Sequence, residues 1–128
     1  MAETEKITIN LSVVDLGWVD LLVEQGFYSN RTDLIRTAIR NQLSKHEQVV
    51  QEAVVRQQFA VGILGHTRQD LEAVRAKGEQ LDIKAVGLVV IANDVTPELA
   101  LDTIRSLNVH GVLRASAAVK EALADQIK

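Results

Sequence analysis

The chain has no cysteine among its 128 residues, a single proline, and few aromatic residues. The lack of cysteine excludes disulfide bonds and thiolate metal ligands, and it agrees with a reducing compartment. No apolar run approaches the roughly 18 residues that a membrane-spanning helix requires. Residues 1–6 are polar and acidic rather than a basic start followed by an apolar run. These absences predict a cytoplasmic protein that is neither exported nor anchored in a membrane.

An excess of positive charge is also missing, because the formal net charge is −3. Residues 1–46 hold five Lys and Arg against six Asp and Glu. Proteins that hold nucleic acid by bulk electrostatics usually carry a visible cationic excess. Any affinity of this chain for a polyanion must therefore come from the placement of a few side chains. The hydrophobic share of 47% is, by contrast, ample for a packed core.

Residues 6–11 alternate strictly between polar and apolar side chains, which predicts a half-buried strand. The apolar set is Ile7, Ile9 and Leu11, and the polar set is Lys6, Thr8 and Asn10. Ser12 follows directly as a helix N-cap with Asp15 in the first turn, so no hairpin partner is available downstream. Because one isolated strand is not stable, we expect the partner strand to come from a second copy of the chain.

Two helices are predicted next. The first covers about residues 13–25 and ends at Gly26, a residue suited to a left-handed C-cap. It is expected to bury Val14, Trp18, Leu21 and Leu22. The second follows Ser29 as N-cap, with Asp33 in its first turn and an apolar stripe beginning at Leu34 and Ile35. We assign this strand-helix-helix module to residues 1–45, followed by a connecting segment, residues 46–58, read as a helix with an extended alternative from Val54.

A weak repeat organises residues 59–128, because short apolar runs recur around Gly62, Gly87 and Gly111. Each run is followed by a helix signal: Thr67 before residues 68–77, Thr96 and Pro97 before residues 99–107, and Ser116 before residues 117–127. Three strand-helix units predict a small α/β domain whose strands are parallel through right-handed crossovers. The glycines would either admit a close approach by a helix or another subunit, or be small residues tolerated in a tight core.

The first module closely resembles the ribbon-helix-helix repressors of bacteria and phages, the Arc, MetJ and CopG type. The likeness rests on the strand, the helix lengths, the turn at Gly26-Phe27-Tyr28 and the Ser29-Asn30-Arg31-Thr32-Asp33 start of the second helix. It implies an α+β fold in which two chains form a swapped dimer, with their strands paired as an antiparallel ribbon in the major groove of DNA.

The resemblance also assigns roles to residues. Lys6, Thr8 and Asn10 would read base edges, and Ser29, Asn30 and Arg31 at the start of the second helix would hold a phosphate. The dimer core would be formed by Ile7, Ile9, Leu11, Trp18, Leu34 and Ile35. Ribbons of this family commonly carry more cations than the single Lys6, and Glu3 and Glu5 would oppose the phosphates. We therefore expect modest affinity per dimer, raised by cooperation between dimers.

The whole layout is loosely similar to the nickel-responsive repressors, but the histidines that alternate along a strand there are replaced here by residues 88–91, Leu-Val-Val-Ile. His46, His66 and His110 lie at no spacing that would form a metal site, so neither metal nor cofactor is expected. Arg114 and Ser116 could hold an anionic effector, or Arg114 could pair with an acid across an interface. No catalytic motif is present, so an enzyme is not expected.

These features predict a DNA-binding transcriptional regulator, a repressor, that acts as a homodimer or homotetramer on an operator. Residues 59–128 would assemble dimers into a higher oligomer or sense an effector. The alternative is an antitoxin-type protein, whose head represses its own gene and whose C-terminal part binds a partner protein. The two hypotheses differ in the C-terminal part: antitoxin tails tend to be disordered when free, whereas residues 59–127 are predicted to fold by themselves. A DNA protein of plasmid partition or relaxation also stays open.

Overall fold

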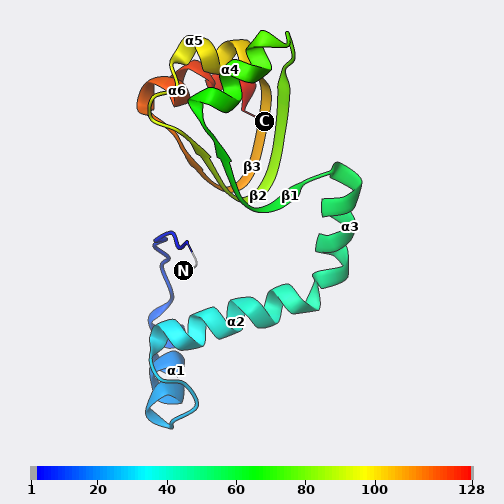
Figure 1. Cartoon of the computed structure of the whole chain (residues 1–128). Helices are drawn as coiled ribbons and strands as arrows, with labels where there is room; N and C mark the ends of the chain where they lie inside the picture. The colour runs from blue at the N-terminus through cyan, green and yellow to red at the C-terminus, as the bar shows by residue number, and fades with distance from the viewer. Residues whose placement is uncertain (1–2, 128) are drawn as a thin grey trace. The chain divides into compact units, whose positions relative to one another are not determined.

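The computed structural model describes residues 3–127. The chain divides into two compact units, Met1–Ala53 and Val54–Lys128, which are described separately below. Figure 1 labels their helices and strands. Among residues 3–127, no helix combines the length and the apolar character needed to cross a membrane.

The N-terminal unit contains α1 (Val13–Glu24), α2 (Arg31–Lys45) and the first part of α3 (Glu47–Gln57). The side chain of Ser12 caps α1 by accepting a hydrogen bond from the Asp15 backbone N–H at 3.1 Å, as the sequence predicts. Gly26 follows the end of α1 with φ 88°, a left-handed conformation that suits glycine. Residues 3–12 belong to no helix and to no strand of this single chain.

The cap of α2 differs from the prediction by one residue. Asn30, not Ser29, is the N-cap, because its side-chain oxygen accepts a hydrogen bond from the Asp33 N–H at 2.8 Å. The Ser29 N–H instead donates to the Asp33 carboxylate at 2.9 Å, so the two ends of this turn are joined twice. Both residue types cap helices well, and the reciprocal bond to Asp33 decides between them.

The C-terminal unit is built from three strand-helix repeats, β1 (Ala60–His66), α4 (Arg68–Ala76), β2 (Leu81–Ile91), α5 (Pro97–Thr103), β3 (Ile104–Arg114) and α6 (Ala117–Ala122), followed by a short 3₁₀ turn, Ala124–Gln126. Thr67, Thr96 and Ser116 cap the three helices as predicted. Two helix ends were predicted wrongly. The helix predicted over residues 99–107, α5, ends at Thr103 because residues 104–107 pair with β2. The helix predicted over residues 117–127, α6, ends at Ala122.

The three strands form one parallel sheet in the order β1-β2-β3, which confirms the predicted parallel arrangement. Two successive right-handed crossovers that step in the same direction place their helices on the same face of a sheet. Figure 1 shows α4, α5 and α6 together on one side. The core lies between these helices and that face, with the following members: Leu71, Ile83, Ala85, Val89, Ile91, Val95, Leu99, Ala100, Ile104, Leu107, Val119 and Leu123.

The repeated glycines lie side by side in the sheet. Gly62 pairs with Gly87, and Gly87 pairs with Gly111. Their φ values are 129°, 134° and 128°, a conformation that L-residues rarely adopt. A Cβ on Gly87 would overlap the Gly62 carbonyl oxygen, and a Cβ on Gly111 would overlap that of Gly87. The glycines are therefore required by the backbone, and neither explanation offered from the sequence accounts for them.

Candidate nucleic-acid interface

The segment predicted to read DNA is fully accessible in the single chain. Lys6, Thr8 and Asn10 are exposed. Their apolar neighbours are exposed as well, with Ile7 at 73%, Ile9 at 54% and Leu11 at 42%. Among the described residues this segment pairs with no strand of its own chain. Three large apolar side chains on a strand-like segment with no partner are costly in water, so this arrangement leaves room for a second chain.

The rest of the N-terminal unit is equally open. None of residues 3–53 is buried, and α1, α2 and α3 contain no buried residue. Where α1 packs on α2, Leu16, Val19 and Val23 are only half-buried, as are Leu34 and Ile35 opposite them.

The residues expected in the core of the first helix lie on its other face. Trp18 is 62% exposed and Val14 65%, with Leu21 and Leu22 near 42% and 40%. Their predicted burial is therefore not found within one chain. A helix that is apolar on both sides is normally buried on both sides. The exposed apolar face of α1 is thus a second surface, besides residues 7–11, that no other part of the described chain buries.

The start of α2 brings the predicted phosphate-binding residues together and adds one that the sequence did not reveal. Asp20 of α1 forms a bidentate ion pair with Arg31, from Nε at 2.7 Å and Nη2 at 2.8 Å. Hydrogen bonding to the guanidinium lowers the pKa of Asp20 and raises that of Arg31. The two residues lie on different helices, so no spacing in the sequence signals the pair. Much of the charge of Arg31 is committed to Asp20.

Other groups remain at this helix start. The first backbone N–H groups of an α-helix have no partner in the helix itself, so the amides of Arg31 and Thr32 point outward with the positive end of the helix dipole. Asn30 uses its side-chain oxygen as the cap and keeps its amide group as a donor. A phosphate oxygen at this place would be held chiefly by these N–H donors, with the Arg31 guanidinium as a partly neutralised neighbour.

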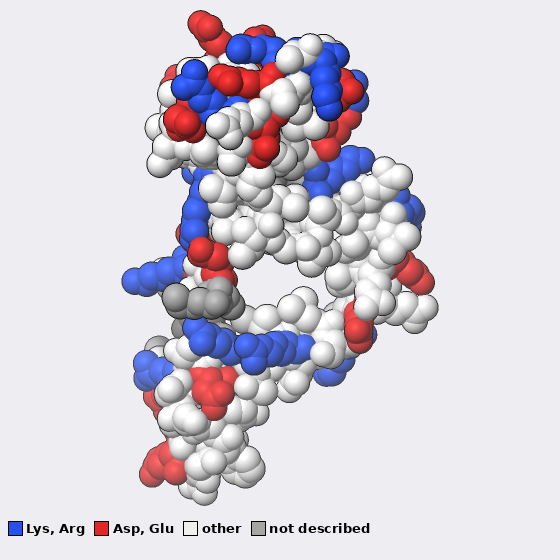
Figure 2. All heavy atoms as spheres, viewed as in Figure 1, with Lys and Arg blue, Asp and Glu red and all other residues white. Residues whose placement is uncertain are grey.

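Two further cations lie along α2. Arg36 and Arg40 are exposed, one helical turn apart, and neither forms an ion pair within residues 3–127. Figure 2 shows Lys and Arg side chains gathered in a row over this helix. Although the unit carries more acids than bases, its unpaired cations are concentrated on one element.

The predicted effector residues of the C-terminal unit lie at the end of β3 and at the start of α6. Arg114 ends β3 in register with Val90, on the face of the sheet opposite the helices, and Ser116 caps α6 by accepting a hydrogen bond from the Val119 N–H at 3.2 Å. The Ser116 side chain thus has a structural role as the cap of α6. An effector at these residues stays a prediction.

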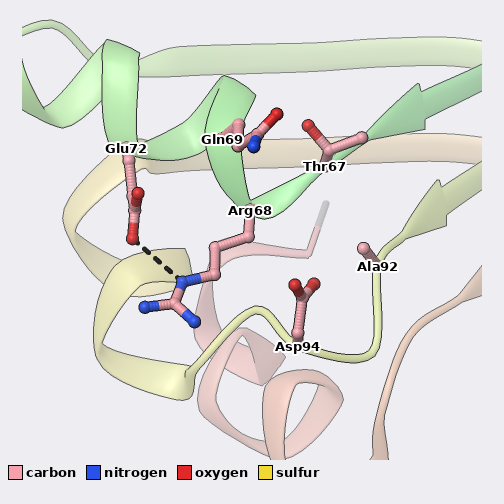
Figure 3. A pocket seen from close by; sticks show the side chains of 6 residues that line it. All are labelled: Thr67, Arg68, Gln69, Glu72, Ala92 and Asp94. Carbon is pink, nitrogen blue, oxygen red and sulfur yellow. Dashed lines mark hydrogen bonds and ion pairs between the residues drawn. The ribbon is translucent and has the colours of Figure 1, made fainter.

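The ends of β1 and β2 border an open hollow with little chemistry to offer. Figure 3 shows Arg68 turned toward Glu72, to which its Nε donates at 2.9 Å, with Asp94 across the hollow. The Thr67 hydroxyl already accepts from the Asp70 N–H at 3.1 Å.

The three histidines have different surroundings. His46 contacts Gln42, His110 packs edge-on against Phe59, and His66 is the last residue of β1, with its pKa lowered by burial. In the part of the chain that the structure describes, no group of three or more His, Asp or Glu side chains could hold a metal ion.

Comparison with known proteins places this geometry in a family. A search of curated proteins and a search of solved structures each found no match. The model of the ribbon-helix-helix transcriptional regulator family matches residues 2–120, which covers the two helices at the N-terminus and the whole three-stranded sheet. Because that match spans most of both units, the chain belongs to the ribbon-helix-helix transcriptional regulator family.

Proposed function

We propose that the protein is a sequence-specific DNA-binding repressor that acts as a homodimer, with residues 6–11 of two chains paired as an antiparallel ribbon in the major groove. The single observation that carries the proposal is that no residue between 3 and 53 is buried in one chain. A unit of this size with exposed Ile7, Ile9, Leu11 and Trp18 has no core of its own, and a second copy supplies one.

The magnitude is sufficient for stable pairing. Complete burial of one Ile or Leu side chain contributes roughly 1.5–3 kcal/mol, and these side chains are about half exposed in the single chain. Burying residues 7, 9 and 11 of both chains therefore contributes on the order of 6 kcal/mol, and the open face of α1 with Trp18 adds to it. The paired strands also satisfy each other's backbone groups, which one chain leaves to water.

Alternation then decides which side chains meet DNA. When Ile7, Ile9 and Leu11 face the dimer core, Lys6, Thr8 and Asn10 face the groove. Asn10 can donate to and accept from one adenine, Lys6 suits guanine acceptors, and Thr8 offers a hydroxyl and a methyl group.

We assign phosphate binding to the backbone N–H groups at the start of α2 and to the Asn30 amide, with Ser29 shaping the turn and Arg31 contributing a charge shared with Asp20. Arg36 and Arg40 add attraction along the helix. The C-terminal unit is proposed to assemble chains, up to a tetramer, or to sense an effector.

The antitoxin-type alternative is less favoured because of the C-terminal unit. Tails that fold on a partner protein lack a core of their own when free. Residues 54–127 contain a sheet, three capped helices and a contiguous buried cluster including Leu71, Val89 and Leu107. A chain that is insoluble until a partner protein is co-expressed would favour the antitoxin. Monodisperse protein whose C-terminal unit resists protease favours the regulator.

A pair of substitutions one residue apart tests the central claim. Ile9→Asp places a charge in the proposed dimer core, so the chain should sediment as a monomer or lose the fold of its N-terminal unit. Thr8→Asp places the same charge on the proposed DNA face, so the dimer should persist while DNA binding is lost. A native dimer in Ile9→Asp, or loss of the dimer in Thr8→Asp, would refute the proposed direction of these side chains.

Base reading has a separate test. Lys6→Ala and Asn10→Ala should change which operator sequences are preferred, measured by competition between DNA sequences at one fixed salt concentration. Lys45→Ala, which removes a cation at the end of α2, serves as the control and should leave the preference unchanged. Unaltered preference in both Lys6→Ala and Asn10→Ala would reject the assignment of these two residues to the bases.

A further inference from the structure

The ion pair of Asp20 with Arg31 lies at the start of α2, where a phosphate is proposed to bind. Arg31 is the first residue of α2, directly after the Asn30 cap, and Asp20 lies in α1. The two carboxylate oxygens accept one hydrogen bond each, from Nε and from Nη2 of Arg31. A guanidinium offers the same two-point geometry to a phosphate. Asp20 therefore occupies an edge of Arg31 that suits a DNA phosphate.

The surroundings of the pair favour a phosphate over the carboxylate. Both side chains are about half exposed, Arg31 at 56% and Asp20 at 50%, so an anion reaches the guanidinium directly from water. Exposed ion pairs shift an equilibrium by no more than about fivefold. A phosphate at this place also meets the first backbone N–H groups of α2 and the positive end of its dipole. The phosphate thus has more partners than the carboxylate that it displaces.

We propose that Asp20 competes with the DNA phosphate for Arg31, so that DNA binding exchanges the carboxylate for a phosphate and releases Asp20 to water. The inference rests on the proposed DNA binding, and it makes Asp20 a positioning residue that lowers affinity through Arg31. Phosphate contacts carry no direct information on sequence. Asp20 therefore weakens binding to every DNA sequence by the same factor and leaves the choice of operator to the base contacts.

A purely structural role for the ion pair predicts the opposite sign. The pair joins two helices whose shared contact, at residues such as Leu16 and Leu34, is only half-buried. If the pair served only to hold α1 on α2, its loss would loosen the N-terminal unit and weaken DNA binding. If Asp20 competes with DNA, its loss strengthens binding. The sign of the change in affinity therefore separates the two roles.

A double-mutant cycle in the full chain tests the exchange. Asp20→Ala removes the competitor, Arg31→Ala removes the group competed for, and the double variant removes both. Glu24→Ala is the control, because Glu24 is exposed one helical turn further along α1 and forms no ion pair within residues 3–127. Dissociation constants are measured at one salt concentration for two probes, a duplex that the wild type selects from a random pool and a scrambled duplex of the same length.

The expected changes follow from two ion pairs in each dimer. Asp20→Ala should bind both duplexes about 2- to 25-fold more tightly than the wild type, and by a larger factor than Glu24→Ala does. In the Arg31→Ala background, Asp20→Ala should give no more than the gain of Glu24→Ala. Sedimentation and far-UV circular dichroism verify assembly and fold. Asp20→Asn, which keeps the shape of the side chain, replaces Asp20→Ala with the same expectations if the alanine variant does not fold.

The outcomes separate this inference from the proposed function. Weaker binding by Asp20→Ala, a gain equal to that of Glu24→Ala, or a full gain that persists without Arg31 overturns the exchange and leaves the proposed function intact. A gain confined to the selected duplex overturns the claim that Asp20 acts on all sequences alike. A wild-type protein that binds neither duplex overturns the proposed function itself, and the exchange with it.

Discussion

Substitution of Gly87 by alanine examines why three glycines lie in register across the sheet. The position combines a φ of 134° with a neighbouring carbonyl oxygen, that of Gly62, in the place where Cβ would be. Gly62 has the same conformation, φ 129°, but open space around a built Cβ. Gly65 has neither constraint. The three sites form a graded series within two adjacent strands.

The expected losses differ by site. A non-glycine residue in a sparsely populated backbone region costs about 1–3 kcal/mol, so Gly62→Ala should destabilise the C-terminal unit by that amount. Gly87→Ala must also displace the central strand from its neighbour, which adds about 1–3 kcal/mol of overpacking. The sum approaches the whole stability of roughly 4–11 kcal/mol for a unit of about 75 residues. Gly65→Ala should be neutral or stabilising by less than about 1 kcal/mol.

Thermal unfolding followed by two signals measures this series. Far-UV circular dichroism reports both units, whereas the only Trp and the only Tyr, Trp18 and Tyr28, lie in the N-terminal unit. A loss of about 1–3 kcal/mol should lower the Tm of the C-terminal unit by roughly 5–20 °C for a domain of this size. Equal Tm values for Gly62→Ala and Gly87→Ala would refute the claim that the carbonyl contact matters, and an unchanged Tm in both would refute the role of positive φ.

Three further predictions concern charge. Asp20→Asn releases Arg31 from its ion pair, so DNA affinity should rise. The slope of log affinity against log salt concentration should steepen by up to about 0.9 per chain, measured by titration at several salt concentrations. Weaker binding would contradict the proposed phosphate site. Hydrogen bonds from Arg105 and Ser106 hold the pKa of Asp82 far below its ordinary value of 3.8. Because the unfolded chain then protonates Asp82 at a higher pH than the folded chain does, stability is lost as pH falls below 3.8. Asp82→Asn should flatten this loss of stability at acid pH, measured by unfolding experiments. Burial lowers the pKa of His66 below its ordinary 6.5, so the unfolded state again binds the proton first and stability should fall as pH drops below 6.5; a His66→Asn variant that keeps the same slope would exclude this cause.

Local signals in the sequence were sufficient for most of the secondary structure. The helix starts after Ser12, Thr67, Thr96 and Ser116 were predicted at the observed residues, because a capping side chain bonds to a backbone N–H three residues ahead. Helix ends were predicted less well. Residues 104–107 continue a helical pattern in the sequence but join β3, because pairing with β2 outweighs local propensity there.

The sequence by itself determined the alternation of residues 6–11, the caps, and the parallel order of three strand-helix units, since each depends on neighbours a few residues apart. Only the tertiary structure decided the ion pair of Asp20 with Arg31, the positive φ of the glycine row, and the face of the sheet that the helices cover. These features join residues distant along the chain, whose meeting depends on how helices and strands pack. The alternation of residues 6–11 lies between the two cases, because its pattern is local while the described part of this single chain supplies no partner strand for it.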